Sequence, residues 1–120
     1  ILERVRKARE EVDIVVVSYH WGEEYETQSN DIQKELARAI IDGGADVVVG
    51  HHPHVVQEIE KYKDGWIAYS LGNFVFDQNF SEETMQGLML RVVVRDGVIS
   101  RVEGVPIRIS ETFQPNVEIQ

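Results

Sequence analysis

Two short runs of β-branched residues constrain the fold of this chain more than any other feature of its sequence. Residues 14–17 read Ile-Val-Val-Val and residues 47–49 read Val-Val-Val, so neither run contains a polar residue. Strands without polar alternation are typical of parallel sheets that are covered on both faces. We therefore expect both runs to form strands of one parallel sheet, each buried on both faces.

The segment between the two runs has the pattern of a helix. Asn30 is expected to be the N-cap, and Gln33, three residues later, can close a capping box. Gly43 and Gly44 are expected to end the helix, because glycine adopts the left-handed conformation of a helix C-terminus at little cost. The apolar positions that mark one face of this helix are Ile32, Leu36, Ala39 and Ile40. A strand, a helix and a second strand in this order predict a βαβ unit.

Residues outside this unit predict a further helix and a first antiparallel hairpin. Residues 1–11 carry apolar side chains at helical spacing among charged ones. Residues 55–62 and 66–70 flank the sequence Lys-Asp-Gly at positions 63–65, which is typical of a turn. We expect the two flanking segments to pair as antiparallel strands.

A second hairpin is predicted near the C-terminus. Residues 88–94 alternate as a strand with one wetter face, and the Asp-Gly pair that follows is the preferred two-residue hairpin turn. The apolar parity of the returning strand changes between Val102 and Val105, so we expect a bulge at Gly104. Residues 111–120 are expected to be a polar tail.

Size, charge and cysteine content exclude several functions. A chain of 120 residues is long enough for a single domain with a modest core. Its net charge of −9 argues against nucleic acid as a partner, and its lack of cysteine excludes disulfides and thiolate metal sites. No apolar run approaches the roughly 20 residues that span a bilayer. Because the sequence starts at Ile1 rather than Met, we expect any export signal or membrane anchor to lie upstream.

All histidines of the chain follow the two apolar runs. They are His20, His51, His52 and His54. Parallel strands that are joined by a helix finish at the same edge of a sheet, and ligands of open α/β sheets bind outside that edge. We therefore expect His20 to lie beside the histidines that follow the second strand.

The spacing of the second group favours a common centre. Pro53 disfavours the helical conformation for His52, and residues i and i+2 of an extended segment face the same side. His52 and His54 are therefore expected to point at one centre, with His51 pointing away or toward a substrate. Gly50 is expected to allow a close approach of backbone.

These side chains suit a divalent metal. Three histidines, His20, His52 and His54, can hold a mononuclear zinc with water as the fourth ligand, whereas a two-metal site also needs bridging carboxylates. The local carboxylates are Glu23, Glu24 and Asp77. Glu23 and Glu24 are expected either to support the histidines or to lie in a solvated loop.

A second polar cluster lies in residues 69–76, Tyr-Ser-Leu-Gly-Asn-Phe-Val-Phe. Asn73 and Ser70 are candidate substrate-binding residues, and the alternative is a structural turn. Phe74 and Phe76 are expected in the core. Ser70 is a poor candidate for a nucleophile, because the Gly-x-Ser-x-Gly motif is absent.

Three segments of the chain resemble the motifs of one protein family. They are residues 18–25 (SYHWGEEY), 44–54 (GADVVVGHHPH) and 68–76 (AYSLGNFVF). In this order they resemble CapA- and PgsA-type proteins of capsule and poly-gamma-glutamate biosynthesis. The resemblance covers most of residues 12–77, whereas residues 88–120 add only generic strands.

That family is similar to the calcineurin-like metallophosphoesterases, which have a layered α/β/β/α sandwich. The resemblance implies that residues 1–120 are a single partial domain, the C-terminal half of such a sandwich. It also implies that His20, His52 and His54 bind two divalent ions, manganese, iron or zinc, together with ligands from the N-terminal half of the same protein. His51 stands where that superfamily usually has glycine.

The resemblance further implies a metal-dependent hydrolase that acts on a phosphoester or an anionic polymer. The Asp-x-His, Gly-Asp and Asn-His motifs of the superfamily are absent from this sequence, so the isolated chain is expected to be inactive. The alternative is a non-catalytic subunit of a membrane-associated polymer synthesis or export complex, extracytoplasmic or at the membrane. The parallel strands would also leave an exposed sheet edge, from which we expect self-association.

Overall fold

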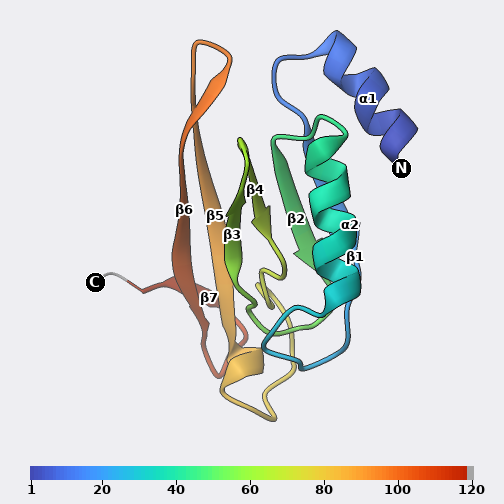
Figure 1. Cartoon of the computed structure of the whole chain (residues 1–120). Helices are drawn as coiled ribbons and strands as arrows, with labels where there is room; N and C mark the ends of the chain where they lie inside the picture. Colours follow the sequence, from blue (N-terminus) through green and yellow to red (C-terminus); the bar gives the residue numbers. More distant parts are fainter. Residues whose placement is uncertain (119–120) are drawn as a thin grey trace.

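The computed structural model describes residues 1–118 and has a mixed α/β architecture (Figure 1). The helices are α1 (Leu2–Glu11), α2 (Asp31–Asp42) and the short 3₁₀ helix η1 (Glu83–Met85). The strands are β1 (Val16–His20), β2 (Val47–His51), β3 (Ile59–Tyr62), β4 (Gly65–Ala68), β5 (Gln86–Arg95), β6 (Val98–Ile109) and β7 (Pro115–Val117). The predicted βαβ unit followed by antiparallel hairpins is confirmed.

The first sheet has the order β1-β2-β4-β3. β1 and β2 are parallel, with Val16 opposite Val47, and β4 continues the parallel arrangement beside β2. β3 pairs antiparallel with β4. Lys63 and Asp64 form the predicted turn between them, and Tyr62 pairs with Gly65 at its ends. Both β1 and β2 therefore end at the same edge of the sheet, and each ends in a histidine.

Helix α2 begins with the expected capping box. The Asn30 side chain accepts a hydrogen bond from the Gln33 backbone N–H at 2.9 Å, and Gln33 Oε1 accepts from the Asn30 N–H at 3.0 Å. The predicted apolar face is confirmed in part: Ile40 is fully buried and Leu36 packs against the core, but Ile32 is 76% exposed. The buried residues are Gln33, Ala37, Ile40 and Ile41. A glutamine is tolerated on this face because its Nε2 donates to Gln57 Oε1 at 2.9 Å.

The two parallel strands differ in burial. Val47 and Val48 of the central strand β2 are fully buried, as expected. β1 lies at the edge of the sheet, and Val16 is 57% exposed, so the expectation that β1 is covered on both faces was wrong. A run of valines gives the tendency to form a strand, but its burial depends on which neighbours the topology supplies.

The second sheet, β5-β6-β7, is antiparallel. Its Asp-Gly turn is confirmed, with Arg95 paired to Val98. The predicted bulge exists but lies elsewhere: the register shifts between Val93 and Val94, whereas Gly104 pairs directly with Leu90. A Cβ on Gly104 would come within 2.9 Å of the Leu88 side chain, so this glycine accommodates a leucine rather than a bulge.

The C-terminal segment is more than the expected polar tail. β7 pairs antiparallel with β6, with Ile109 opposite Pro115. Ile109 and Ile107 are buried, which gives this segment an apolar strand to pair with. Residues 119–120 of the predicted tail lie outside the described residues.

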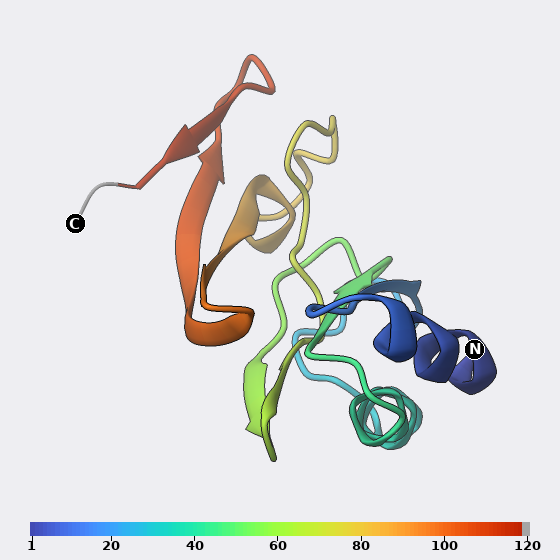
Figure 2. The ribbon, with the colours of Figure 1, turned by 90° about the horizontal axis from the view of Figure 1, so that it is seen from above.

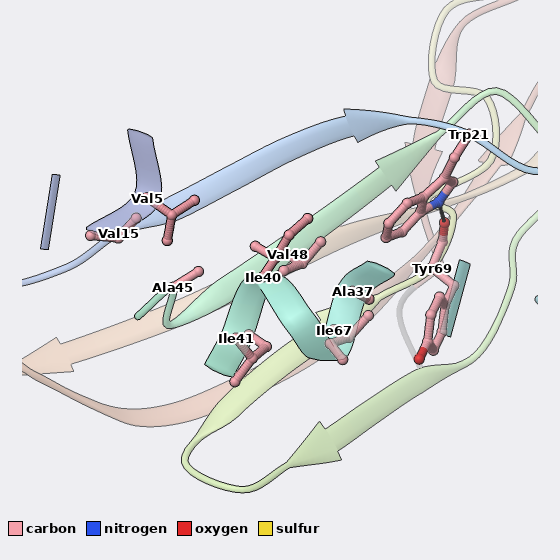
Figure 3. Close-up of a cluster of buried hydrophobic side chains, with 10 residues drawn as sticks. All are labelled: Val5, Val15, Trp21, Ala37, Ile40, Ile41, Ala45, Val48, Ile67 and Tyr69. Carbon is pink, nitrogen blue, oxygen red and sulfur yellow. Dashed lines mark hydrogen bonds between the residues drawn. The ribbon is translucent and has the colours of Figure 1, made fainter. Parts of the chain in front are cut away.

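The elements form layers (Figure 2). Helices α1 and α2 cover one face of the first sheet, and the core between them includes Val5, Ile40, Val48 and Ile67 (Figure 3). The β5-β6-β7 sheet lies on the opposite side. Residues 1–118 thus form one helical layer and two sheet layers. None of the helices described is long and apolar enough to cross a membrane.

The exposed edge of β1 leads to a prediction about association. An unpaired strand edge with an exposed valine is a template for pairing with another chain. We expect the 120-residue chain to self-associate in light scattering, and Val16→Lys to lower the association constant about tenfold or more, since charge on an edge strand opposes pairing. Ile32→Lys, on the exposed face of α2, is the matched control. A monodisperse monomer at all concentrations would contradict the prediction.

Candidate metal centre

The histidines gather where β1 and β2 end. His20 and His51 are register partners on the neighbouring strands. The His20 and His52 ring centroids are 4.5 Å apart, and those of His52 and His54 are 6.1 Å apart. The predicted approach of His20 to the second histidine group is therefore what the structure shows, and the topology of the βαβ unit is its cause.

The conformation of this segment differs from the prediction. His52 has a φ of 105° and His54 has a φ of 61°, so the segment is bent rather than extended. Pro53 does keep His52 out of the helical region, but the chain moves to positive φ instead of an extended strand. Pro53 is fully buried, and its carbonyl accepts from the Tyr25 N–H at 2.8 Å, which fixes the bend. Positive φ at a residue other than glycine stores strain, and such strain clusters at functional sites.

Gly50 makes the close packing behind the histidines possible. A Cβ at this position would lie 1.9 Å from the Tyr69 carbonyl oxygen and 2.4 Å from Trp21 Nε1. The same indole nitrogen donates to that carbonyl at 2.8 Å (Figure 3). The expected close approach of backbone at Gly50 is therefore confirmed, and it joins the ends of β1, β2 and β4.

Glu24 joins two of the histidines. Ligand atoms of Glu24, His52 and His54 all lie within 4.8 Å of one another. Within residues 1–118, the group whose ligand atoms lie this close together contains Glu24 in place of the predicted His20. Sequence reasoning placed Glu24 beside the site but not among the ligating atoms, since its position depends on how the loop after His20 folds back.

Buried glutamine holds that loop in place. Gln57 is 3% exposed, and its Nε2 donates to the carbonyls of Glu26 at 2.8 Å and Gln28 at 3.1 Å. The next residue, Glu58, accepts from the Ser29 hydroxyl and backbone N–H. Burial raises the pKa of the Glu58 carboxyl, but hydrogen bonds from Ser29 and from the Glu58 backbone, together with the charge of Lys34, outweigh burial, so its pKa is lowered overall. The loop that carries Glu24 is thus tied to the strand leading into β3.

The two candidate substrate-binding side chains of residues 69–76 face inward. Ser70 is 1% exposed, and its Oγ accepts from the Gly72 N–H at 3.2 Å within the turn. Asn73 is 6% exposed, and its Oδ1 lies 2.9 Å from His54 Nδ1. Both side chains are nearly buried and make hydrogen bonds within the protein, and their predicted role in substrate binding stays a prediction. Asn73 belongs to the site through His54.

The aromatic residues of the same segment were expected in the core and are instead exposed. Phe74 and Phe76 are 53% and 42% exposed. The ring of Phe76 lies 5.1 Å from that of His54, and Tyr25 lies 6.2 Å from it. Aromatic rings therefore flank His54. The apolar pattern of residues 74–76 alone could not distinguish such exposed aromatic positions from core positions.

His51 faces a different space from His52. It lines a cavity of about 470 Å³ between the two sheets, whose other walls include Val47, Val49 and Leu88. Burial, reinforced by the nearby His20, lowers the pKa of the His51 imidazole. Burial therefore favours the neutral form of the His51 imidazole. The position of His51 in this cavity agrees with the predicted orientation away from the His52–His54 centre.

The donor set of Glu24, His52 and His54 fits a divalent metal. Neutral imidazole nitrogen and carboxylate oxygen are the ligands that zinc, manganese and iron accept, and three protein ligands leave positions open for water or substrate. A metal-binding histidine commonly gives its other ring nitrogen to a protein acceptor, and Asn73 Oδ1 is such an acceptor for His54. The chemistry of the residues present therefore agrees with a metal centre.

Comparison with known proteins gives one family. A sequence model of the family described as "Bacterial capsule synthesis protein PGA_cap" matches residues 1–78. These residues include α1, the βαβ unit, all four histidines and the turn that carries Asn73.

Individual relatives extend further along the chain. "Capsule biosynthesis protein CapA" of Bacillus anthracis is 44% identical over 115 residues, which is 92% of this chain and 28% of that protein. "PGA biosynthesis protein CapA" of Bacillus subtilis is 48% identical over 107 residues, or 89% of this chain and 28% of that protein. A "probable polyglutamine synthesis accessory protein" of Mycobacterium tuberculosis is 33% identical over 110 residues, 82% of this chain and 28% of that protein. The chain thus spans about a quarter of the length of these relatives.

Proposed function

Because this chain belongs to the bacterial capsule synthesis protein PGA_cap family, we propose that its protein acts in the synthesis of an anionic capsule polymer, as a metal-dependent phosphoesterase. The family assignment and the names of the relatives support the role in capsule synthesis. The observation that carries the metal-dependent chemistry is the convergence of Glu24, His52 and His54 on one point at the sheet edge.

Each of these side chains has a defined part in the proposal. Glu24 contributes a negative charge that favours a cation over a neutral ligand, while His52 and His54 contribute neutral nitrogen donors. His20, whose ring lies 4.5 Å from that of His52, is the nearest further donor for a second ion. When bound, a divalent metal supplies a hydroxide at neutral pH and positive charge for a phosphoryl oxygen.

The net charge of the domain makes a metal useful for binding an anionic substrate. A chain with a net charge of −9 repels phosphate and polyanions unless a local positive charge compensates. A bound divalent ion is commonly the largest local charge in such a site. The exposed rings of Phe76 and Tyr25 beside His54 would form an apolar wall next to that charge.

The proposal is tested on the full-length protein with paired carboxylate variants. We expect hydrolysis of an aryl phosphodiester that is abolished by chelator and restored by manganese or zinc. Glu24→Gln is expected to weaken metal affinity by on the order of tenfold or more, because it removes a charged ligand. The neighbouring Glu23→Gln is the matched control, because Glu23 lies outside the donor group. Calorimetric titration with the metal alone measures both.

Two outcomes would contradict the proposal in different ways. Equal metal affinity for the Glu24 and Glu23 variants would show that the donor group does not hold the metal. Tight metal binding without any chelator-sensitive hydrolysis would reject the phosphoesterase and favour a non-catalytic subunit of a polymer synthesis complex, in which the same site binds an anion.

A further inference from the structure

Asn73 connects the candidate metal centre to the protein interior. It lies in the turn after β4, is 6% exposed, and each of its side-chain polar atoms has a protein partner. Oδ1 lies 2.9 Å from His54 Nδ1, while Nδ2 donates to the Thr84 carbonyl at 3.0 Å and to Gln78 Oε1 at 3.2 Å. The amide is therefore fully engaged, with one end directed at a histidine of the donor group.

The hydrogen bond to Thr84 fixes which way the amide points. A backbone carbonyl can only accept, so the NH₂ group of Asn73 must face Thr84 and the oxygen must face His54. An oxygen in that position requires a proton on His54 Nδ1. We propose that Asn73 is a positioning residue that holds His54 in the Nδ1–H tautomer and leaves Nε2 unprotonated as the metal-binding nitrogen. The inference rests on the proposed function in taking the ligand to be a metal.

The acceptor at Thr84 is itself fixed in place. Thr84 is 1% exposed, and its hydroxyl donates to the Gln78 carbonyl at 2.6 Å. The backbone of Asn73 packs against β5, where a Cβ on Gly87 would come within 2.0 Å of the Asn73 carbonyl oxygen. Neither end of the Asn73 amide can therefore rotate without breaking buried contacts.

The same network reaches the ring that flanks His54. Gln78 accepts from Asn73 through Oε1 and donates through Nε2 to the Tyr25 hydroxyl at 3.2 Å. The ring centroids of Tyr25 and Phe76 lie 6.2 Å and 5.1 Å from that of His54. Aromatic packing thus restricts the ring plane, and the hydrogen bond to Asn73 selects the nitrogen that carries the proton.

This selection matters for metal binding because the two tautomers offer different nitrogens. Free neutral imidazole favours the Nε2–H form, in which Nε2 has no lone pair for a metal. The hydrogen bond made by the other nitrogen determines which one can bind a metal. Residues that orient a metal ligand in this way commonly change metal affinity by about 10- to 100-fold when they are removed.

The test measures the tautomer directly in the metal-free protein. Two-bond ¹⁵N–¹H correlation spectra at pH 8, with the His54 signals assigned through His54→Gln, distinguish a protonated Nδ1 from a protonated Nε2. We expect the Nδ1–H form in the wild type and a shift to a mixture or to Nε2–H in Asn73→Ala. Zinc affinity of Asn73→Ala should fall by about 10- to 100-fold.

Two further variants separate positioning from folding. Asn73→Asp keeps the oxygen acceptor that faces His54 but loses the donor to the Thr84 carbonyl. It should therefore lower stability, yet retain the Nδ1–H tautomer and bind zinc with affinity equal to or tighter than that of the wild type. Gln78→Ala removes a partner of the Asn73 amide but leaves Oδ1 facing His54, so the tautomer should persist. A role in folding alone would instead lower the stability of Asn73→Ala without changing its tautomer.

The outcomes for this inference and for the proposed function can be told apart. A wild type in the Nε2–H form, or an unchanged tautomer in Asn73→Ala, would overturn the positioning role even if zinc binds tightly. The Nδ1–H tautomer and its loss in Asn73→Ala would support the positioning role even if no metal binds, and would then count against the metal proposal alone.

Discussion

Gly50→Ala is expected to destabilise the domain by about 3 kcal/mol or more, the upper range for overpacking a core position. The added Cβ would lie 1.9 Å from the Tyr69 carbonyl oxygen, which is backbone and cannot move as a flexible side chain can. Moving this carbonyl would also break its hydrogen bond from Trp21 Nε1. The substitution therefore acts at the junction of β1, β2 and β4, directly behind the histidines.

Gly97→Ala provides the matched control for this effect. Gly97, unlike Gly50, has the left-handed conformation that favours glycine, with a φ of 75°, but a Cβ there would meet only the Asp13 side chain, at 3.6 Å. We expect a cost of about 1–2 kcal/mol, the price of the left-handed conformation alone. Urea denaturation of both variants measures the difference. Equal destabilisation would show that the close approach at Gly50 is not what makes glycine necessary there.

The features that the sequence predicted well depend on local chemistry. The capping box of α2 and the Asp-Gly turn involve residues that are close in the chain, so their geometry follows from the residue types alone. The βαβ unit follows from two apolar strands and a helix of suitable length. Its handedness and shared strand edge then brought His20 near His52 without further information.

The features that the sequence did not predict depend on contacts between distant residues. Gln33 is buried because Gln57, 24 residues away, accepts its hydrogen bond. Val16 is exposed because β1 is an edge strand, which its composition cannot reveal. Glu24 reaches the donor group because Gln57 holds the loop residues that follow it, Glu26 and Gln28, in place. In each case the pattern gave the element, and a long-range partner decided which side chain it presents.

The histidine motif combines a local sequence pattern with a conformation that distant contacts determine. Convergence of His52 and His54 was predicted from an extended segment, yet both residues have positive φ. The spacing of two histidines around a proline is compatible with either backbone, and the buried contact of Pro53 with the loop selects the bent one. The geometry of this motif therefore depends on tertiary packing even though its residues are adjacent.

His52→Gly is expected to abolish the metal centre with little or no loss of stability. A φ of 105° is costly for histidine, and such strain amounts to about 1–3 kcal/mol. Glycine adopts this conformation readily. The substitution also removes the ring contact with His20, a pair worth about 0.5–1.5 kcal/mol. The net effect on the free energy of unfolding of the metal-free protein should therefore range from a loss of about 0.5 kcal/mol to a gain of about 2.5 kcal/mol.

The adjacent residue supplies the control for backbone strain. His51 lies in regular strand β2, so His51→Gly should lower the free energy of unfolding by about 0.5–1 kcal/mol or more. Denaturant titrations without metal compare the two variants, and calorimetry with zinc measures the binding that His52→Gly should lose. If both glycine variants lose stability equally, His52 stores no strain. If His52→Gly retains wild-type zinc affinity, the strained backbone at position 52 does not serve metal binding, and the donor group loses its central member.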